Sequence, residues 1–261
     1  TITTGQIESL STSLVPNLSN GVVSAFTNEQ VAVLTTDQID KLSTAHITAM
    51  SSGQLAALDT SQLEVFSTAQ IVAIETQDMP ALREEQLANL SSTQTAALTT
   101  AQLNALTAQQ WTALTNGQVQ ALTTAQVANL STAQIKSLTT DQVSTLTSAQ
   151  AKALTTAQLS AMTSAQTSAI TTAQASSLNT AQLAALLSGM QAASLTTAQV
   201  AALTTSQVAA LSTKQASELS SAQVAALTTA QVAAFETVDF AALSTSAVSA
   251  LSSSQAAAFT T

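Results

Sequence analysis

The sequence has no cysteine and no tyrosine, and it contains few charged or aromatic residues. Without cysteine there is neither a disulfide framework nor a thiolate metal site. Charged residues make up 7% of the chain, against about 25% in typical soluble domains. Aromatic residues make up only 2%. A thick core is therefore excluded, because too few large side chains exist to fill it, and the packing must be thin and built from Leu, Val, Ile and Ala.

Positive charge is also scarce. The chain has 5 Lys and Arg residues and a net charge of −9. Nucleic acids and anionic membrane surfaces attract Lys and Arg, so neither is an expected partner. No run of about 18 apolar residues exists, which argues against membrane insertion.

A large apolar residue, called the anchor below, recurs at every eighth position. The step begins at Ile2 and Leu10 and continues to Leu178 and Leu186. One additional residue within 187–195 moves the next anchor to Leu195, after which the step of eight continues to Phe259. A repeat with this period is the strongest signal in the sequence, and each repeat is called an octad.

The octad excludes two simple structures. Eight residues overshoot two turns of a continuous α-helix by about 80°, so the apolar stripe would wind around such a helix. Coiled coils need repeats of seven or eleven residues. A strand would need alternating polar and apolar residues, which the stretch LTTAQVAAL, residues 195–203, does not have.

The octad instead carries a helix start signal. The anchor is followed by Ser or Thr and, three residues later, by Gln. This is the capping box, in which the hydroxyl accepts the N3 backbone N–H and the Gln side chain accepts the N-cap N–H. The next residue, usually Val or Ile, is N4, and its contact with the preceding anchor is the hydrophobic staple. Each octad therefore predicts one helix of about six or seven residues.

Such short helices are not stable alone, so the sequence predicts an all-α solenoid in which each helix stacks on its neighbours. The connections are too short for antiparallel pairs, and about three or four helices per turn are expected. A β-solenoid is the alternative. One domain is predicted over 1–261, with irregular, capping-like repeats at about 10–26 and 236–261. We expect open solenoid ends to invite head-to-tail association of identical chains.

The Gln positions form a second periodic feature, which we call the glutamine column. Glu never occupies this position, although a capping box accepts Glu as readily as Gln. We hypothesise that the column glutamines also hydrogen-bond to neighbouring backbone or to one another. His46, the single histidine, stands in the column, where an imidazole can replace Gln. Trp111 stands at N4 and is expected to be a large staple residue, the alternative being an exposed carbohydrate-stacking ring.

No residue set indicates catalysis, a cofactor or a metal. There is no G-x-S-x-G motif, no phosphate-binding loop and no calcium-loop motif. The 14 acidic residues are expected on solvated faces and at helix N-termini. Asp59, Glu75 and Glu236 stand at N-cap positions. The chain is therefore expected not to be an enzyme.

Two resemblances follow from these motifs. LTTAQVAAL resembles the opening of the repeat in plant-pathogen TAL effectors, but the chain lacks the rest of that unit, including its base-reading loop and basic stripe, so the resemblance does not imply DNA binding. The Thr/Ala/Gln-rich array is similar to repeat regions of bacterial surface and secreted proteins of the adhesin and haemagglutinin kind. That resemblance implies an extracellular or cell-surface structural protein.

The expected function is accordingly a filament, sheath, surface-layer or stalk protein at the bacterial cell surface. Low charge removes the usual barrier to self-association. Two alternatives remain at this point. Columns of Thr could bind glycans or ice, or the chain could be a passive spacer within a larger protein.

Overall fold

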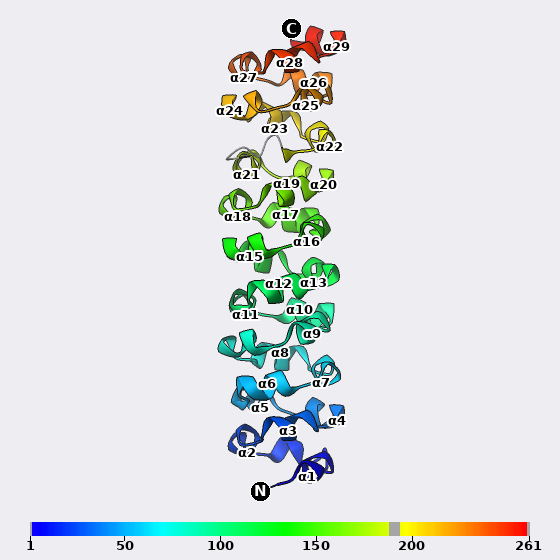
Figure 1. The fold of residues 1–261 in the computed structure, drawn as a ribbon, viewed down its shortest axis with the longest axis vertical. Helices are drawn as coiled ribbons and strands as arrows, with labels where there is room; N and C mark the ends of the chain where they lie inside the picture. Colours follow the sequence, from blue (N-terminus) through cyan, green and yellow to red (C-terminus); the bar gives the residue numbers. More distant parts are fainter. Residues whose placement is uncertain (1, 188–193, 260–261) are drawn as a thin grey trace. The chain divides into compact units, whose positions relative to one another are not determined.

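The computed structural model describes residues 2–187 and 194–259, and all regular secondary structure in these residues is helical (Figure 1). The β-solenoid alternative is therefore wrong for this part of the chain. The chain forms two compact units, Thr1–Leu130 and Ser131–Thr261. The step of eight runs through this boundary in the sequence, at Leu122, Leu130 and Leu138. The single solenoid over 1–261 stays a prediction, and each unit is described by itself below.

The first unit consists of short α-helices and two 3-10 helices, η1 and η2. They are α1 (Thr4–Glu8), η1 (Val15–Asn17), α2 (Asn20–Ser24), α3 (Asn28–Ala32), α4 (Thr36–Asp40), α5 (Thr44–Ala49), α6 (Ser52–Ala57), α7 (Thr60–Glu64), α8 (Thr68–Ala73), η2 (Thr76–Ala81), α9 (Glu84–Ala88), α10 (Ser92–Ala97), α11 (Thr100–Ala105), α12 (Ala108–Ala113), α13 (Asn116–Ala121) and α14 (Thr124–Ala128).

The second unit repeats this pattern. Its described helices are α15 (Thr132–Ser137), α16 (Thr140–Thr145), α17 (Ser148–Ala153), α18 (Thr156–Ser160), α19 (Ser164–Ala169), α20 (Thr172–Ser177), α21 (Thr180–Leu186), α22 (Thr197–Ala201), α23 (Thr205–Ala209), α24 (Thr213–Ser217), α25 (Ser221–Ala225), α26 (Thr229–Ala233), α27 (Thr237–Ala241), α28 (Thr245–Ser249) and α29 (Ser253–Phe259).

Helix α11 shows why each helix is short. Its N-cap Thr99 is extended, with φ −71° and ψ 158°, and its hydroxyl accepts the backbone N–H of Gln102. The Gln102 side chain accepts the N–H of Thr99 in return, at 2.8 Å. The helix ends at Leu106, which is again extended, with φ −64° and ψ 138°. Leu106 leads directly into the next N-cap, Thr107. Two extended residues per octad therefore turn the chain, and the predicted capping boxes are confirmed in most octads.

The core is thin, as the composition predicts. It consists mainly of two apolar positions per octad, N4 and the anchor, which lie three residues apart and share one helix face. In α11 these are Leu103 and Leu106, which are 0% and 5% exposed. Trp111 is also fully buried at N4. The prediction of a large staple residue is confirmed, and an exposed carbohydrate-stacking ring is excluded.

Within each unit, helices three octads apart pack against one another. Examples are α2 with α5 and α10 with α13 in the first unit, and α17 with α20 and α18 with α21 in the second. Side chains also reach backbone groups 28 residues earlier, as Gln54 does to Phe26. One turn of each solenoid therefore contains between three and four octads, as the sequence predicts.

Irregular octads have irregular helices. Pro16 lies in the first turn of η1, and Pro80 lies inside η2. Proline lacks a backbone N–H and disfavours α-helical conformation in the residue before it, which accounts for 3-10 rather than α-helical geometry at both places. Within residues 2–187 and 194–259, no helix is long and apolar enough to cross a membrane.

Candidate functional site

The glutamine column is the most regular polar feature of the molecule, and each of its side chains serves two helices. The Gln54 Oε1 accepts the backbone N–H of Ser51 at 2.7 Å, which caps the start of α6. The Gln54 Nε2 donates to the backbone carbonyls of Val23 and Phe26, at 2.9 and 2.8 Å. These carbonyls lie 31 and 28 residues earlier, at the C-terminal end of α2. We call this pair of donated hydrogen bonds the clamp.

The clamp explains why the column contains Gln and never Glu. A helix leaves its last carbonyls without intrahelical partners, and buried carbonyls without a donor are costly. An amide side chain accepts through its oxygen and donates through its nitrogen, whereas a carboxylate only accepts. The hypothesis that column glutamines bond to neighbouring backbone is confirmed. The acceptors are carbonyl oxygens of the preceding turn of the solenoid, as for Gln62, Gln102, Gln166 and Gln231.

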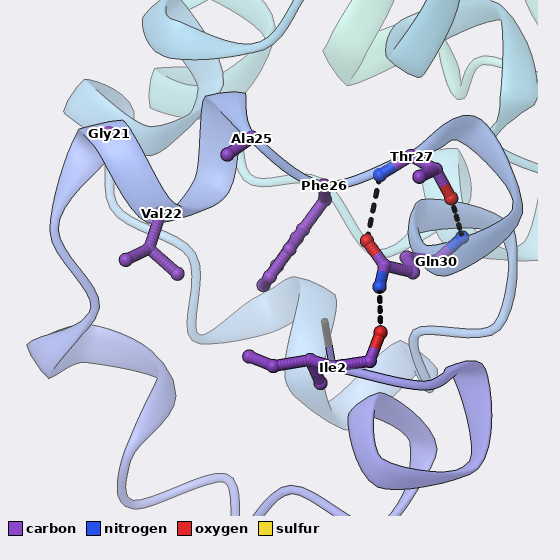
Figure 2. A pocket seen from close by; sticks show the side chains of 7 residues that line it. All are labelled: Ile2, Gly21, Val22, Ala25, Phe26, Thr27 and Gln30. Carbon is purple, nitrogen blue, oxygen red and sulfur yellow. Dashed lines mark hydrogen bonds between the residues drawn. The ribbon is translucent and has the colours of Figure 1, made fainter.

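Figure 2 shows this arrangement at Gln30, near the start of the chain. Gln30 Oε1 accepts from the backbone of Thr27, while its Nε2 donates to the carbonyl of Ile2. The side chains of Ile2, Val22 and Phe26 converge beside it and line a pocket of about 420 Å³. Ile2 and Val22 are 52% and 37% exposed. The pocket is apolar and contains no titratable group, so it offers a hydrophobic contact surface.

His46 takes the place of glutamine, as predicted. Its Nδ1 accepts the backbone N–H of Ser43 at 3.2 Å, and its Nε2 lies 2.8 Å from the carbonyl oxygen of Leu18. Because a carbonyl can only accept, this geometry assigns the proton to Nε2. The imidazole is 3% exposed. Both of its nitrogens are occupied by structural hydrogen bonds, which supports a structural role over metal binding.

Two acidic residues also stand in the column. Asp78, in η2, is 7% exposed, and burial raises the pKa of its carboxyl, with the charge of Glu75 adding to the effect. Asp239, in α27, is 4% exposed and accepts a hydrogen bond from the Thr213 hydroxyl at 2.8 Å. The period of eight places both residues in the column.

The extra residue in 187–195 changes the sequence separation between donor and acceptor in the clamps that follow it. Residues 188–193 lie outside the described residues. Beyond them, Gln207 donates to Ala175 and Leu178, which are 32 and 29 residues earlier instead of 31 and 28. By Gln223 the separation is again 28, to Leu195. The clamps therefore follow the turns of the solenoid rather than a fixed separation in sequence.

The remaining acidic residues serve helix ends and solvent. The Asp59 carboxylate caps α7 by accepting the N–H of Gln62 at 2.7 Å. The Ser61 hydroxyl that donates to Asp59 keeps the pKa of this carboxyl below its usual value, helped by backbone N–H groups and Arg83. Glu75 and Glu236 stand at N-caps as expected, but neither side chain makes the capping bond. In the described part of the chain, no three His, Asp or Glu residues are grouped so as to hold a metal ion.

The chain was compared with curated proteins and with protein-family models. No curated protein matches the chain. The family model described as the ALTTAQ repeat matches residues 39–74, 71–108, 111–148, 119–156, 205–237 and 232–261. The matched segments cover more than half of the chain. The chain therefore belongs to the ALTTAQ repeat family.

Proposed function

We propose that this chain is a structural repeat protein of the bacterial cell surface that associates head to tail with copies of itself, as a filament, sheath, surface layer or adhesin stalk. It performs no catalysis in this role. One observation carries the proposal: the clamp has a direction. In the described part of the chain the column glutamines donate to carbonyls of the preceding turn, and anchor carbonyls accept from the following turn, as Phe66 and Ile74 do from Gln94 and Gln102.

A directed clamp makes the two edges of a turn complementary. One edge presents amide donors and the other presents carbonyl acceptors, so a turn from another copy fits where a turn of the same chain would fit. In a heterologous contact, one copy is related to the next by a rotation combined with a translation. Such contacts produce an open filament and not a closed ring. The low charge supports this association, since little electrostatic repulsion opposes it.

The pocket of Ile2, Val22 and Phe26 supplies an apolar contact surface for such an association. The second unit also has exposed apolar side chains. Val238 in α27 is 62% exposed, and Val248 in α28 is 40% exposed. An exposed apolar patch such as this pocket is typical of interaction surfaces. We propose that these residues take part in the contact between copies.

Negative-stain electron microscopy over a concentration series tests the proposal. Filaments of constant width should form above a threshold concentration, and Val22→Asp should raise that threshold by roughly tenfold, since it places a charge in the apolar contact. Val72→Asp is the matched control: Val72 is 47% exposed on α8, away from the pocket, and its replacement should leave the threshold unchanged. Monodisperse particles at all concentrations would reject self-association and favour a passive spacer.

A further inference from the structure

One helix of the first unit lacks its clamp. From Ile2 to Leu98, the carbonyl of every anchor except Met50 accepts a hydrogen bond from a side chain of the glutamine column. The accepting residues are Ile2, Leu10, Leu18, Phe26, Leu34, Leu42, Leu58, Phe66, Ile74, Leu82, Leu90 and Leu98. Met50 ends α5. The C-terminal carbonyls of this helix are therefore the ones that the column leaves without an amide donor.

The reason lies 28 residues later in the sequence, at Asp78. Asp78 stands in the glutamine column. Glutamines in this column donate to the carbonyls 28 and 31 residues earlier, as Gln110 does. For Asp78 these are the carbonyls of Met50 and Ile47. A carboxylate cannot donate to a carbonyl, but a neutral carboxyl group has one O–H donor. The protonation state of Asp78 thus decides whether the last turn of α5 has a donor opposite it.

The surroundings of Asp78 contain little other charge. Helices α6 and α11 pack against η2, and α2 and α8 pack against α5. None of these four helices contains an acidic or basic residue. Beside Asp78 stands Glu75, which precedes η2 and accepts from the Gln77 amide at 2.7 Å. Helix α5 itself carries one titratable side chain, His46, whose two ring nitrogens are hydrogen-bonded to Ser43 and Leu18. Burial and the negative charge of Glu75 both favour the neutral carboxyl, and they raise its pKa above the ordinary value of 3.8.

We propose that Asp78 is an acid-operated latch between η2 and α5. When a proton from solvent neutralises the carboxylate, the new O–H donates to the carbonyl of Met50 and closes the missing clamp. When the proton leaves, a buried negative charge faces the carbonyl end of α5, and this step of the solenoid opens more readily than its neighbours.

The sign of the pH effect follows from the direction of the shift. An acid whose pKa is raised in the folded state destabilises that state when it is ionised. The penalty is absent below pH 3.8, grows as the pH rises from there, and is complete above the raised folded pKa. Acidification within this window should therefore tighten the contact between α5 and η2.

Amide hydrogen exchange, with intrinsic rates corrected for pH, tests the latch in the full chain. Between pH 7 and pH 4, protection of α5 and η2 should rise roughly fivefold relative to α12 and α13, which is the change that one hydrogen bond produces. In Asp78→Gln and Asp78→Asn, protection should already be high at pH 7 and should not depend on pH in this range.

Asp239→Gln is the matched control. Asp239 stands in the same column, but its carboxylate has a hydroxyl donor in Thr213. This substitution should leave α5 and η2 unchanged at both pH values. Because the wild-type chain is itself measured at two pH values, failure of a variant to fold does not decide the outcome. The same comparison is made in His46→Gln, which removes the titratable side chain of α5 while keeping its cap. Equal or lower protection of α5 and η2 at pH 4 in both wild type and His46→Gln would overturn the latch.

Discussion

The Nε2 atom of Gln110 lies 2.7 Å from the carbonyl oxygen of Leu82, 28 residues earlier. The same nitrogen also donates to Met79 at 2.9 Å, while Oε1 accepts from Thr107 at 2.8 Å. One uncharged side chain thus caps the start of α12 and the end of η2. Repetition of this relationship joins successive turns within each unit.

Gln110→Glu is expected to lower the free energy of unfolding by about 2–3 kcal/mol at neutral pH, because two buried carbonyls lose their donor and face a negative charge. Gln109→Glu, at the neighbouring exposed position, is the control. It should be neutral or slightly stabilising, since an acid in the first helical turn interacts well with the helix dipole. Urea unfolding of both variants measures the difference, and equal midpoints would contradict the role of the clamp.

His46→Gln should leave the stability within about 1 kcal/mol of wild type, because the amide can make the same kinds of bonds as the imidazole. His46→Leu should cost about 2–3 kcal/mol, since the N–H of Ser43 and the carbonyl of Leu18 both lose their partner. Thermal unfolding followed by circular dichroism distinguishes the two variants. If the Leu variant were as stable as the Gln variant, the hydrogen bonds of His46 would contribute nothing.

Asp59 should make stability depend on pH in acid. The pKa of its carboxyl is lowered in the folded protein, chiefly by the Ser61 hydroxyl. Its contribution is therefore complete above the ordinary value of 3.8 and is lost as the pH falls through the lower folded value. Asp59→Ala should cost about 1 kcal/mol at pH 7, the usual effect of losing an N-cap.

Unfolding of wild type and Asp59→Ala at pH 7 and at pH 2 measures this effect. The difference between the two proteins should shrink at pH 2. Asp59→Ser is the control, because a hydroxyl caps the helix without titrating. A wild-type advantage that stayed constant down to pH 2 would show that the charge of Asp59 plays no part in capping.

Removal of one complete octad, Ser91–Leu98, should leave the fold intact. Gln102 would then lie 31 and 28 residues after Leu63 and Phe66, the carbonyls that Gln94 uses in the intact chain. The urea midpoint should change little, and the slope of the unfolding curve should fall slightly because less surface is exposed on unfolding. Removal of Thr95–Leu98 alone is the control. It displaces the glutamines from their carbonyls and should lower the midpoint clearly.

Much of this architecture could be predicted from the period and the capping box. The S/T-x-x-Q spacing specified where helices such as α11 begin, and the anchor specified where they end. The acceptors of the clamp could not be identified, because the separation of 28 residues depends on how many octads complete a turn. That number is set by the angle between successive helices, at extended residues such as Leu106 and Thr107, and no local pattern encodes it.

For the same reason, the proposed role of Asp78 could not be predicted from the sequence. This role depends on the carbonyl of Met50, 28 residues earlier, and that separation follows from the turn geometry. The neighbouring sequence indicates only an irregular octad with Pro80. Glu75 and Glu236 show the converse. Their positions at N-caps were evident from the period, but the absence of a capping hydrogen bond from either carboxylate was not.

The tolerance of the clamps to one extra residue before Leu195 has a consequence for how such a chain can change over generations. An octad corresponds to a whole number of codons, so unequal recombination between neighbouring copies adds or removes octads without shifting the reading frame. The hydrogen bonds re-form with the next available carbonyls, as they do after the extra residue at Gln207 and Gln223. Length can therefore vary between descendants of one gene while the remaining octads keep their clamps.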